Sequence, residues 1–407
     1  MKKSIVKPQA RTLTAAILLA LGAASAHADV TQGEFHGYFR AGAGSNSEKG
    51  SQACFGLNGV AKYRYGNECD TYGEFSYTKE LAKSANGTSF VGTVMPNFYE
   101  PDSGASGNNW GMAQMFVEAR NVDFLKGATA WVGKRFYNRP DIHVLDLKMV
   151  HMDGTGFGID GLKVGPGQFG YALMRNDSGT TASATRHHFL YHGLPANTAA
   201  TFDLDATLFT ADTTVPNSHG GYALSVAHKQ GNILGGDNTL WLQYAQGAGV
   251  SLSMGQVGSL LNSSDVTQSR IGDQLIWSVS PEFTGGVDFI YQNTRTTAGT
   301  TTWTSIGTRP TYALSDNLKL ILDLGHDRVK PAGGGATQQL TKVSFGPALT
   351  MGKGFWSRPE LRAFVTYAKW NDAAQAAATP GSALSSTGVF GNSTNGTSYG
   401  VQVESWF

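Results

Sequence analysis

Hydrophobic and polar side chains alternate one by one in several separate segments of the chain. Residues 318–324, for example, place four leucines on one face, with Lys319, Ile321 and Asp323 between them. The same alternation runs through residues 35–41, 61–65, 69–77 and 399–407. A period of two predicts β-strands, because successive side chains of a strand point to opposite faces. No helical period of convincing length follows residue 28, so the pattern predicts an all-β protein.

Alternation alone does not separate a soluble β-sandwich from a transmembrane β-barrel. Here the strand-like segments recur up to the last residue, aromatic residues cluster at their ends, and Gly, Ser, Thr and Asn fill the connections. In a transmembrane barrel the apolar face meets lipid and the polar face meets a wet lumen, which fits this pattern. We therefore expect one antiparallel transmembrane barrel over residues 29–407, with an even number of strands in the high teens. A closed barrel of that size encloses an aqueous channel.

The first 28 residues have the features of a secretory signal peptide. Lys2, Lys3, Lys7 and Arg11 form a basic segment, residues 13–24 form an apolar core, and Ala26-His27-Ala28 offers a cleavage site. The alternative, a membrane anchor, requires a longer apolar core. We expect residues 1–28 to be removed, which leaves 379 residues for the exported protein.

Charge and hydropathy exclude several classes of protein. Without the leader the net charge is −3, so no basic excess is left to attract nucleic acid. The chain is 41% hydrophobic, too apolar for a disordered polymer. No stretch after residue 25 contains the 18 or so consecutive apolar residues of a membrane-spanning helix, which argues against a helical transporter or receptor.

Five segments rich in Gly, Ser and Asn are expected to be exposed loops. They are residues 43–58, 84–113, 176–186, 291–303 and 371–397. Barrels of the outer-membrane type have long outer loops and short periplasmic turns.

Two cysteines, Cys54 and Cys69, lie fifteen positions apart in the exported chain. In an oxidising periplasm such a pair is most simply a disulfide that closes a loop. The alternative, a metal site, would need two further ligands nearby.

No pattern in the sequence supports enzymatic chemistry or a cofactor. Motifs of nucleophilic hydrolases, zinc proteases and phosphate-binding loops are absent. His187, His188 and His192 resemble a metal cluster, but on a strand His187 and His188 point to opposite faces. We therefore expect no metal, no cofactor and no catalytic residue.

The polar face of the predicted strands carries aromatic rings as well as charges. Tyr38, Tyr72 and Trp406 fall in the inward register, where an aromatic belt facing lipid cannot explain them. Arg40, Arg64 and Glu74 fall in the same register. Rings with interleaved charges suit a pyranose, whose C–H faces pack on rings while its hydroxyls bond to charged groups. The alternative is that these rings fill gaps behind a loop folded into the barrel.

Several stretches of the chain resemble the maltoporins, the sugar-specific porins of Gram-negative outer membranes. The resemblance covers nearly the whole chain after the leader. It is densest at residues 35–40 (FHGYFR), 61–74 (AKYRYGNECDTYGE), 133–146 (GKRFYNRPDIHVLD), 356–371 (WSRPELRAFVTYAKWN) and the final SWF.

The resemblance implies an 18-stranded barrel with an inward-folded third loop, assembled as a homotrimer in the outer membrane. It also implies a Cys54–Cys69 disulfide. The family's aromatic lane for sugars matches Tyr38, Tyr72, Trp356 and Trp406, and Trp110 lies within one position of a tryptophan that a neighbouring subunit contributes to the lane. The family's charged track matches Arg40, Arg64, Glu74, Arg139, Asp141 and Asp146, and a constriction histidine matches His143.

Three positions depart from the family pattern. Lys148 stands where the family has a tyrosine at the narrowest point. Asp237 aligns with a lane position that is usually Phe, although a slip of the alignment onto Trp241 is possible. Val117 aligns with an arginine of the charged track. Lys148 places a mobile cation at the throat, which should weaken stacking and favour anions or more polar solutes, unless it pairs with Asp141 or Asp146.

The sequence thus predicts facilitated diffusion of maltose-like oligosaccharides through an outer-membrane channel, without covalent chemistry. The expected partners are sugars, membrane lipid and two further copies of the chain. The first alternative is a general or anion-preferring porin with Lys148 and arginines as its filter. A second alternative, a receptor or adhesin with a plugged lumen, predicts negligible conductance.

Overall fold

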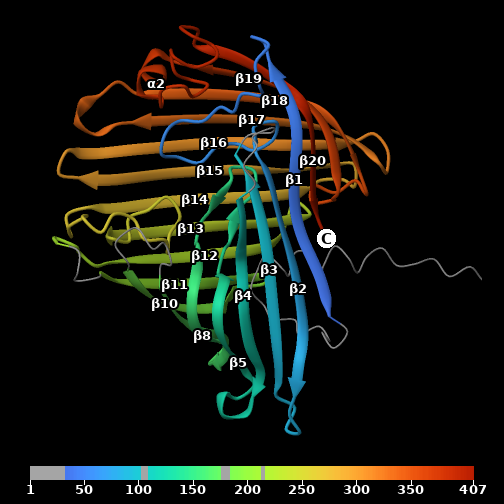
Figure 1. Ribbon diagram of the computed structural model, residues 1–407, viewed down its shortest axis with the longest axis vertical. Helices are drawn as coiled ribbons and strands as arrows, with labels where there is room; N and C mark the ends of the chain where they lie inside the picture. Colours follow the sequence, from blue (N-terminus) through green and yellow to red (C-terminus); the bar gives the residue numbers. More distant parts are fainter. Residues whose placement is uncertain (1–32, 102–108, 176–183, 212–215) are drawn as a thin grey trace, which may run out of the picture.

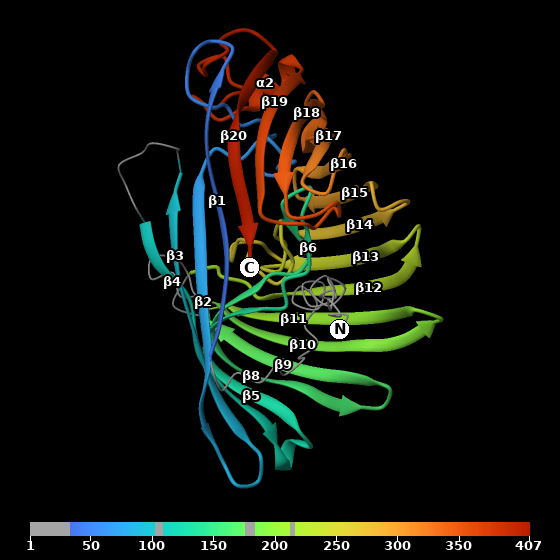
Figure 2. The same ribbon diagram turned by 90° about the vertical axis from the view of Figure 1, so that its right-hand side faces the viewer.

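The computed structural model describes residues 33–101, 109–175, 184–211 and 216–407, and the predicted signal peptide lies outside these residues. Eighteen strands form one antiparallel sheet. Strand β1 (Glu34–Asn46) pairs both with β2 (Thr71–Lys83) and with the last strand, β20 (Asn395–Trp406), so the sheet closes on itself. Figure 2 shows β1 and β20 side by side. The prediction of an 18-stranded antiparallel barrel is confirmed.

The remaining strands follow one another around the barrel in chain order (Figure 1). They are β3 (Ser89–Glu100), β4 (Asn109–Val122), β5 (Ala128–Tyr137), β8 (Met152–Val164), β9 (Gly167–Arg175), β10 (Ala184–Asn197), β11 (Ala200–Ala211), β12 (Gly221–Ile233), β13 (Gly236–Gly247), β14 (Thr267–Ser278), β15 (Phe283–Thr296), β16 (Gly299–Ala313), β17 (Leu318–Lys330), β18 (Gln338–Thr350) and β19 (Glu360–Trp370). Short elements complete the chain: the two-stranded hairpin β6 (Asp141–Ile142) and β7 (Leu147–Lys148), the helix α2 (Asp372–Ala377), and the 3-10 turns Asp123–Leu125 and Ala332–Gly334. Among the described residues, no helix is both long and apolar enough to cross a membrane.

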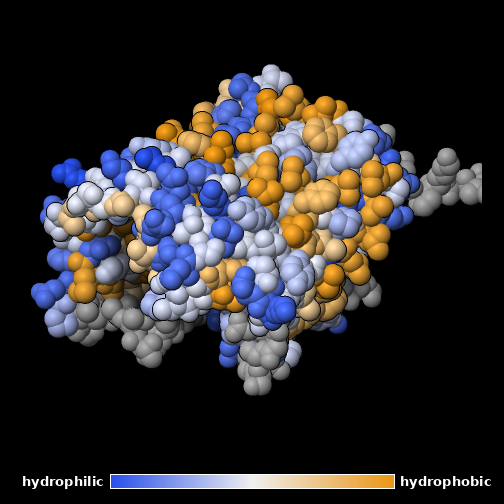
Figure 3. Space-filling view, turned by 90° about the horizontal axis from the view of Figure 1, so that it is seen from above, coloured by the Kyte–Doolittle hydropathy of each residue, from blue (hydrophilic) through white to orange (hydrophobic). Residues whose placement is uncertain are grey.

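The two faces of the wall differ as the alternation predicts. In β19 the exposed residues include Leu361, Val365 and Tyr367, whereas Arg362 and Thr366, at positions between them, are buried. The exposed face is apolar because it meets hydrocarbon, and the charged residues point into the barrel. In Figure 3 apolar residues gather over the strand-covered part of the visible face, and hydrophilic residues gather toward the end that bears the long connections.

Two of the predicted loops are wrong. Residues 84–113 contain the whole of β3 and the start of β4, and residues 291–303 belong to β15 and β16 except for a turn at 297–298. Residues 84–113 are rich in Gly, Ser and Asn, and residues 291–303 are rich in Thr, so composition alone suggests loops. Pairing with neighbouring strands outweighs such weak local preferences.

The segment 61–65 is the opposite case, because it was expected to be a strand and is not one in the described structure. It lies in the long connection 47–70 between β1 and β2, which folds into the barrel. Tyr63 of this connection is buried against the paired residues Gly307 and Gly325 of β16 and β17. A Cβ atom on Gly307 or Gly325 would lie 2.0 or 2.1 Å from the Tyr63 ring, so both positions need glycine.

A second connection, residues 138–151 between β5 and β8, also folds into the barrel and contains the β6–β7 hairpin. Ile142, Leu145 and Met149 of this segment are fully buried. They share a hydrophobic cluster with inward-facing residues of the wall, including Trp241 and Trp303. This connection is the third at its end of the barrel, so the predicted inward-folded third loop is present. The two folded connections narrow the lumen.

Candidate pore and its lining residues

Four aromatic rings from distant parts of the chain lie next to one another inside the barrel. Tyr38 on β1 lies directly opposite Trp406 on β20, and its ring centroid is 6.0 Å from that of Tyr72 on β2. Trp356, in the connection 351–359 between β18 and β19, has its ring centroid 6.2 Å from that of Trp406. We call Tyr72, Tyr38, Trp406 and Trp356 the aromatic lane. Closure of the sheet brings its members together, because β1 and β20 are otherwise at opposite ends of the chain.

Trp110 does not join the lane of its own subunit. It is the second residue of β4 and lies on the outer face of the wall, where it is 69% exposed and packs against Phe98 at 5.5 Å between ring centroids. Phe98 in turn packs against Phe75, so these rings form a patch on the outside of the barrel. The role inherited from the resemblance, contact with the lane of another subunit, stays a prediction.

Arg64, from the connection 47–70, is the central cation beside the lane. Its guanidinium donates to the hydroxyl group of Tyr38 at 2.6 Å and to Glu68 at 2.7 Å. It also donates to Nδ1 of His143 at 2.9 Å and lies 3.4 Å from Glu404. One side chain therefore joins the first connection, the third loop and the wall.

His143 is a neutral imidazole in this arrangement. Burial, together with the neighbouring Arg64, lowers the pKa of His143 well below its usual value of 6.5. A guanidinium can only donate, so Nδ1 is the acceptor and the proton of the neutral ring resides on Nε2. The His143 ring also contacts Trp356 and Trp406, at 5.5 and 5.6 Å between centroids.

Glu404 on β20 binds several cationic side chains next to the aromatic lane. Its carboxylate accepts from Arg358 at 3.0 Å, from Arg362 at 3.0 Å and from the Tyr38 hydroxyl at 3.1 Å. Arg358 also lies over the Trp406 ring, 4.3 Å from its centroid. Sequence reasoning missed the roles of Glu404, Arg358 and Arg362, although Glu404 has the same inward register as Trp406. The inward register of β20 could have indicated Glu404, but not its partners.

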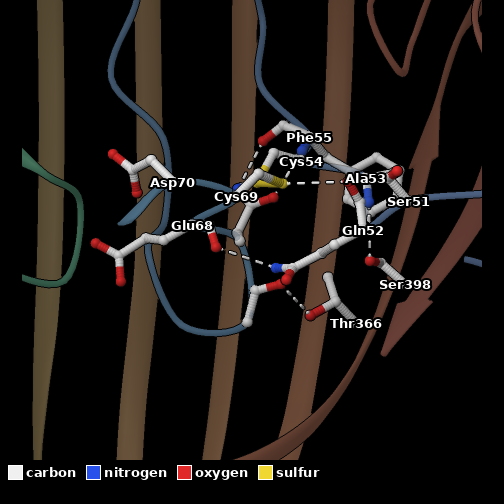
Figure 4. The surroundings of a disulfide bond; sticks show 12 residues. Ser51, Gln52, Ala53, Cys54, Phe55, Glu68, Cys69, Asp70, Thr366 and Ser398 are labelled. Atoms are coloured by element: carbon white, nitrogen blue, oxygen red, sulfur yellow. Dashed lines mark hydrogen bonds between the residues drawn. A yellow bond between two sulfur atoms is a disulfide. The ribbon is translucent and has the colours of Figure 1, made fainter. Parts of the chain in front are cut away.

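The connection 47–70 supplies two further carboxylates that flank the second cysteine. Asp70 binds Arg40 through two hydrogen bonds of 2.9 and 2.6 Å, and Glu68 lies 3.4 Å from the same arginine. Figure 4 shows Glu68 and Asp70 extending to the same side of Cys69. No pattern in the sequence singles out these two residues, because their role depends on how the connection folds.

The predicted disulfide between Cys54 and Cys69 is confirmed, with 6.0 Å between the Cα atoms (Figure 4). Next to it, Asn67 accepts a hydrogen bond from the backbone N–H of Phe55 and donates to the carbonyl oxygen of the same residue. The disulfide thus fixes the stretch that carries Glu68 and Asp70.

The third loop contributes the remaining candidates. Asp141 and Lys148 are paired residues of the β6–β7 hairpin. In the described part of the chain no carboxylate oxygen lies within 4.0 Å of the Lys148 ammonium. An ion pair of Lys148 with Asp141 or Asp146 is therefore not formed in the described structure. Asp146 lies 3.9 Å from Arg64. Burial alone would raise the pKa of Asp146, but Arg64, Arg40 and Lys148 together lower it.

Two further candidates lie close to the rings. Glu74 accepts a hydrogen bond of 2.5 Å from the Tyr72 hydroxyl, so it stands at the edge of the lane. Arg139 lies over the Phe136 ring at 3.8 Å and 3.3 Å from Asp153, at the start of the third loop.

The other two departures from the family pattern lie in the wall of the barrel, Val117 on β4 and Asp237 on β13. Val117 is an exposed residue on the outer face of β4, so it lines no part of the pore. Trp241 points inward but is buried in the cluster beneath the third loop. Asp237 lies near the start of β13, opposite Ile276. The position of Val117 therefore does not fit the place in the charged track that the family resemblance implies for it.

The histidines near residue 190 have ordinary partners. His187 bonds to the Tyr171 hydroxyl group at 2.9 Å, and His188 bonds to the hydroxyl group of Thr207 at 2.9 Å. Within the described ranges, no group of three or more His, Cys, Asp or Glu residues is arranged to hold a metal ion.

Comparison with known proteins agrees with this architecture. The family of LamB porins matches residues 33–407. Solved structures with a similar fold include OccAB1 of Acinetobacter baumannii, which is 11% identical with a TM-score of 0.54 and matches 94% of this chain and 98% of its own. OpdQ of Pseudomonas aeruginosa is 9% identical with a TM-score of 0.53, and matches 93% of this chain and 99% of its own. OpdK of the same organism, solved with vanillate, is 8% identical with a TM-score of 0.52, and matches 92% of this chain and 98% of its own.

At these low identities the solved structures establish the fold alone. The family match covers almost the whole chain and, with the closed barrel, indicates a channel rather than an enzyme, located in the bacterial outer membrane. The chain therefore belongs to the LamB porin family.

Proposed function

We propose that the pore conducts maltose-like oligosaccharides by facilitated diffusion along the aromatic lane. The observation that carries this proposal is the continuous run of Tyr72, Tyr38, Trp406 and Trp356 inside the barrel, with Arg64 and Glu404 along its edge. Exposed rings inside a wet lumen are costly unless a ligand or a neighbouring group covers them. Sugar C–H faces provide such a cover.

Polar atoms beside the rings would exchange hydrogen bonds with the sugar hydroxyl groups. Nε1 of Trp406, Nε2 of His143 and Oδ1 of Asp141 are buried and have no hydrogen-bond partner among the described residues. A buried polar atom without a partner is unfavourable, so a sugar hydroxyl group that displaces the side chains covering one of these atoms would relieve that cost. The arginines and carboxylates bind one another, so they offer fixed dipoles that need little rearrangement as a sugar moves. Binding at each position has to remain weak for the sugar to be released quickly.

The direct test is block of the ion current through single reconstituted channels by maltose, maltotriose and longer oligosaccharides. We expect wild-type protein to show block that strengthens with chain length, and Trp406→Ala to weaken it by about tenfold, the loss of one stacking contact of about 1.4 kcal/mol. Tyr367→Ala, which removes a ring from the outer face of β19, serves as the matched control. The proposal fails if none of the saccharides blocks the wild-type current.

A second candidate is a general or anion-preferring pore. The observation in its favour is Lys148, whose ammonium lies in the third loop without a carboxylate within 4.0 Å in the described structure. A cation at a constriction attracts anions and excludes small cations. The two functions differ in whether neutral sugars block the current.

We also propose assembly as a homotrimer surrounded by outer-membrane lipid. Family membership and the exposed ring of Trp110, which packs on Phe98 on the outer face, support this proposal. The mass of the detergent-solubilised complex, measured by light scattering, tests it, and a monomer mass at all protein concentrations would contradict it.

A further inference from the structure

Strand β3 places a fifth aromatic residue beside the lane. Tyr99 lies directly opposite Tyr72 in the β2–β3 pair. Side chains of directly opposite residues in an antiparallel pair point to the same face of the sheet. Tyr72 points into the lumen, where its ring lies 6.0 Å from Tyr38 and where the Arg40 guanidinium is 5.4 Å from its centroid. Tyr99 therefore points into the lumen as well, and it is 39% exposed there.

Tyr99 lies at the outer end of the lane. It is the next-to-last residue of β3, at the end of the barrel where the connection 47–70 leads into β2. The row of paired residues across the sheet runs Arg40, Tyr72, Tyr99 and Asn109. Tyr72 and Tyr99 share this row, whereas Tyr38 pairs with Glu74, two residues further from the strand ends. A solute that enters from this end therefore reaches the row of Tyr99 and Tyr72 before it reaches Tyr38 and the throat.

The strand register places two asparagines next to Tyr99 on the same face of the sheet. Asn97 is two residues earlier on β3 and lies opposite Glu74, and Asn109 lies opposite Tyr99 on β4. Glu74 accepts the hydrogen bond of the Tyr72 hydroxyl at 2.5 Å. A ring with carboxamides at neighbouring positions of the same face offers stacking together with donors and acceptors, the combination that a pyranose needs.

The neighbouring aromatic residues cannot take this role. Phe98 and Trp110 contact each other on the outer face, one position away from Tyr99 and Asn109 in sequence. A strand places adjacent residues on opposite faces, so Tyr99 is the ring of this segment that faces the lumen.

We infer that Tyr99, with Asn97 and Asn109, forms an entrance subsite that binds a pyranose unit and passes it to Tyr72. This inference rests on the proposed sugar conduction. The subsite extends the aromatic lane by one ring, Tyr99, which belongs to the same subunit. A ring from a neighbouring subunit is not needed for it.

The test is the chain-length dependence of current block in Tyr99→Ala. We expect the binding constant for maltohexaose to fall about 3- to 10-fold, the size of one lost stacking contact. Maltose should change less than about twofold, because a short sugar can occupy the deeper rings instead. The association rate should fall for sugar added on the side of the long connections. Tyr99→Phe should keep wild-type binding, because it retains the ring.

Tyr367→Ala again provides the control, since Tyr367 lies near the same end of a strand but on the outer face. Unchanged ion conductance shows that a variant has folded. If Tyr99→Ala does not fold, Tyr99→Leu replaces it, because leucine keeps most of the side-chain volume without a ring. The entrance subsite is wrong if every sugar blocks the Tyr99→Ala or Tyr99→Leu channel as strongly as it blocks the wild-type channel while block of Trp406→Ala is weakened. That result would leave sugar conduction intact. Absence of block in the wild-type channel would instead overturn sugar conduction and this subsite with it.

Discussion

The hydroxyl group of Tyr38 donates a hydrogen bond to the carboxylate of Glu404 across the junction of the first and last strands, with 3.1 Å between the oxygen atoms. Arg64 donates to the same hydroxyl group and lies 3.4 Å from the same carboxylate. The closure of the barrel, the position of the first connection and the orientation of a lane ring therefore depend on one another. Glu404 is the residue common to all three.

Replacing Glu404 with Gln should destabilise the barrel. The change leaves Arg358 and Arg362, which are almost fully buried, with one fewer negative charge. Breaking one partner of a buried ion pair costs about 3 kcal/mol or more, because the remaining charge is left uncompensated. Denaturant unfolding in lipid vesicles measures the change, with Glu48→Gln on the exposed part of the first connection as the control. Equal unfolding midpoints for the two variants would contradict the central position given to Glu404.

Replacing Lys148 should change the ion selectivity of the pore. Lys148→Gln removes a cation from the third loop, so the reversal potential in a salt gradient should shift toward cation selectivity. Lys148→Tyr should cause the same shift and also strengthen sugar block about threefold, by adding a ring at the throat. Lys49→Gln, at an exposed loop position, is the matched control. If the reversal potential stays constant in both Lys148 variants, Lys148 is not part of the ion filter.

The neutral state of His143 leads to a pH prediction. Its pKa lies well below 6.5 in the folded protein, because of burial and Arg64. Below about pH 6.5 the unfolded chain takes up a proton that the folded protein does not, so the folded state loses stability as the pH falls and regains it as the pH rises. Unfolding midpoints at about pH 5 and about pH 8 should therefore differ, and the difference should be smaller in His143→Asn.

Ion selectivity, unlike stability, should not change with the titration of a histidine. Because His143 stays neutral in the folded channel, the reversal potential should show no step centred near pH 6.5. Such a step, lost in His143→Asn, would show that His143 is protonated in the open pore and would contradict the assigned tautomer.

Removal of the disulfide should loosen the first connection. Cys54 and Cys69 are 15 residues apart, and a crosslink over a loop of that length contributes about 3 kcal/mol by restricting the unfolded chain. The double variant Cys54→Ser/Cys69→Ser should unfold at lower denaturant concentration and show more current noise, because Glu68 and Asp70 flank Cys69. Reduction of the wild-type protein should reproduce both effects. A reduced channel with wild-type stability and noise would contradict a structural role for the bridge.

The local pattern of the sequence determined which way each strand residue faces. Tyr38, Tyr72 and Trp406 were placed in the inward register from alternation alone, and they do lie inside the barrel. A strand has a period of two whatever its neighbours are, so a few consecutive residues suffice for this prediction. The number of strands followed from the length of the chain and the family resemblance.

Composition was a poor guide where a segment was rich in Gly, Ser and Asn. Residues 84–113 were expected to be a loop, which concealed β3 and with it the inward position of Tyr99. The alternation places Arg64 on a strand, whereas it lies in the connection 47–70 that folds into the barrel.

The contacts that shape the pore were decided only by the tertiary structure. Glu404 meets Arg64 from 340 residues away, and Tyr63 fits against Gly307 and Gly325. These contacts exist because the closed sheet brings the two ends of the chain together and encloses the first and third connections. Nothing in the local alternation specifies which inward residues will meet across the lumen, because that depends on closure and on the path of the connections. The sequence alone therefore determined the inner and outer faces of the wall, and the closed barrel determined the arrangement of charges and rings inside it.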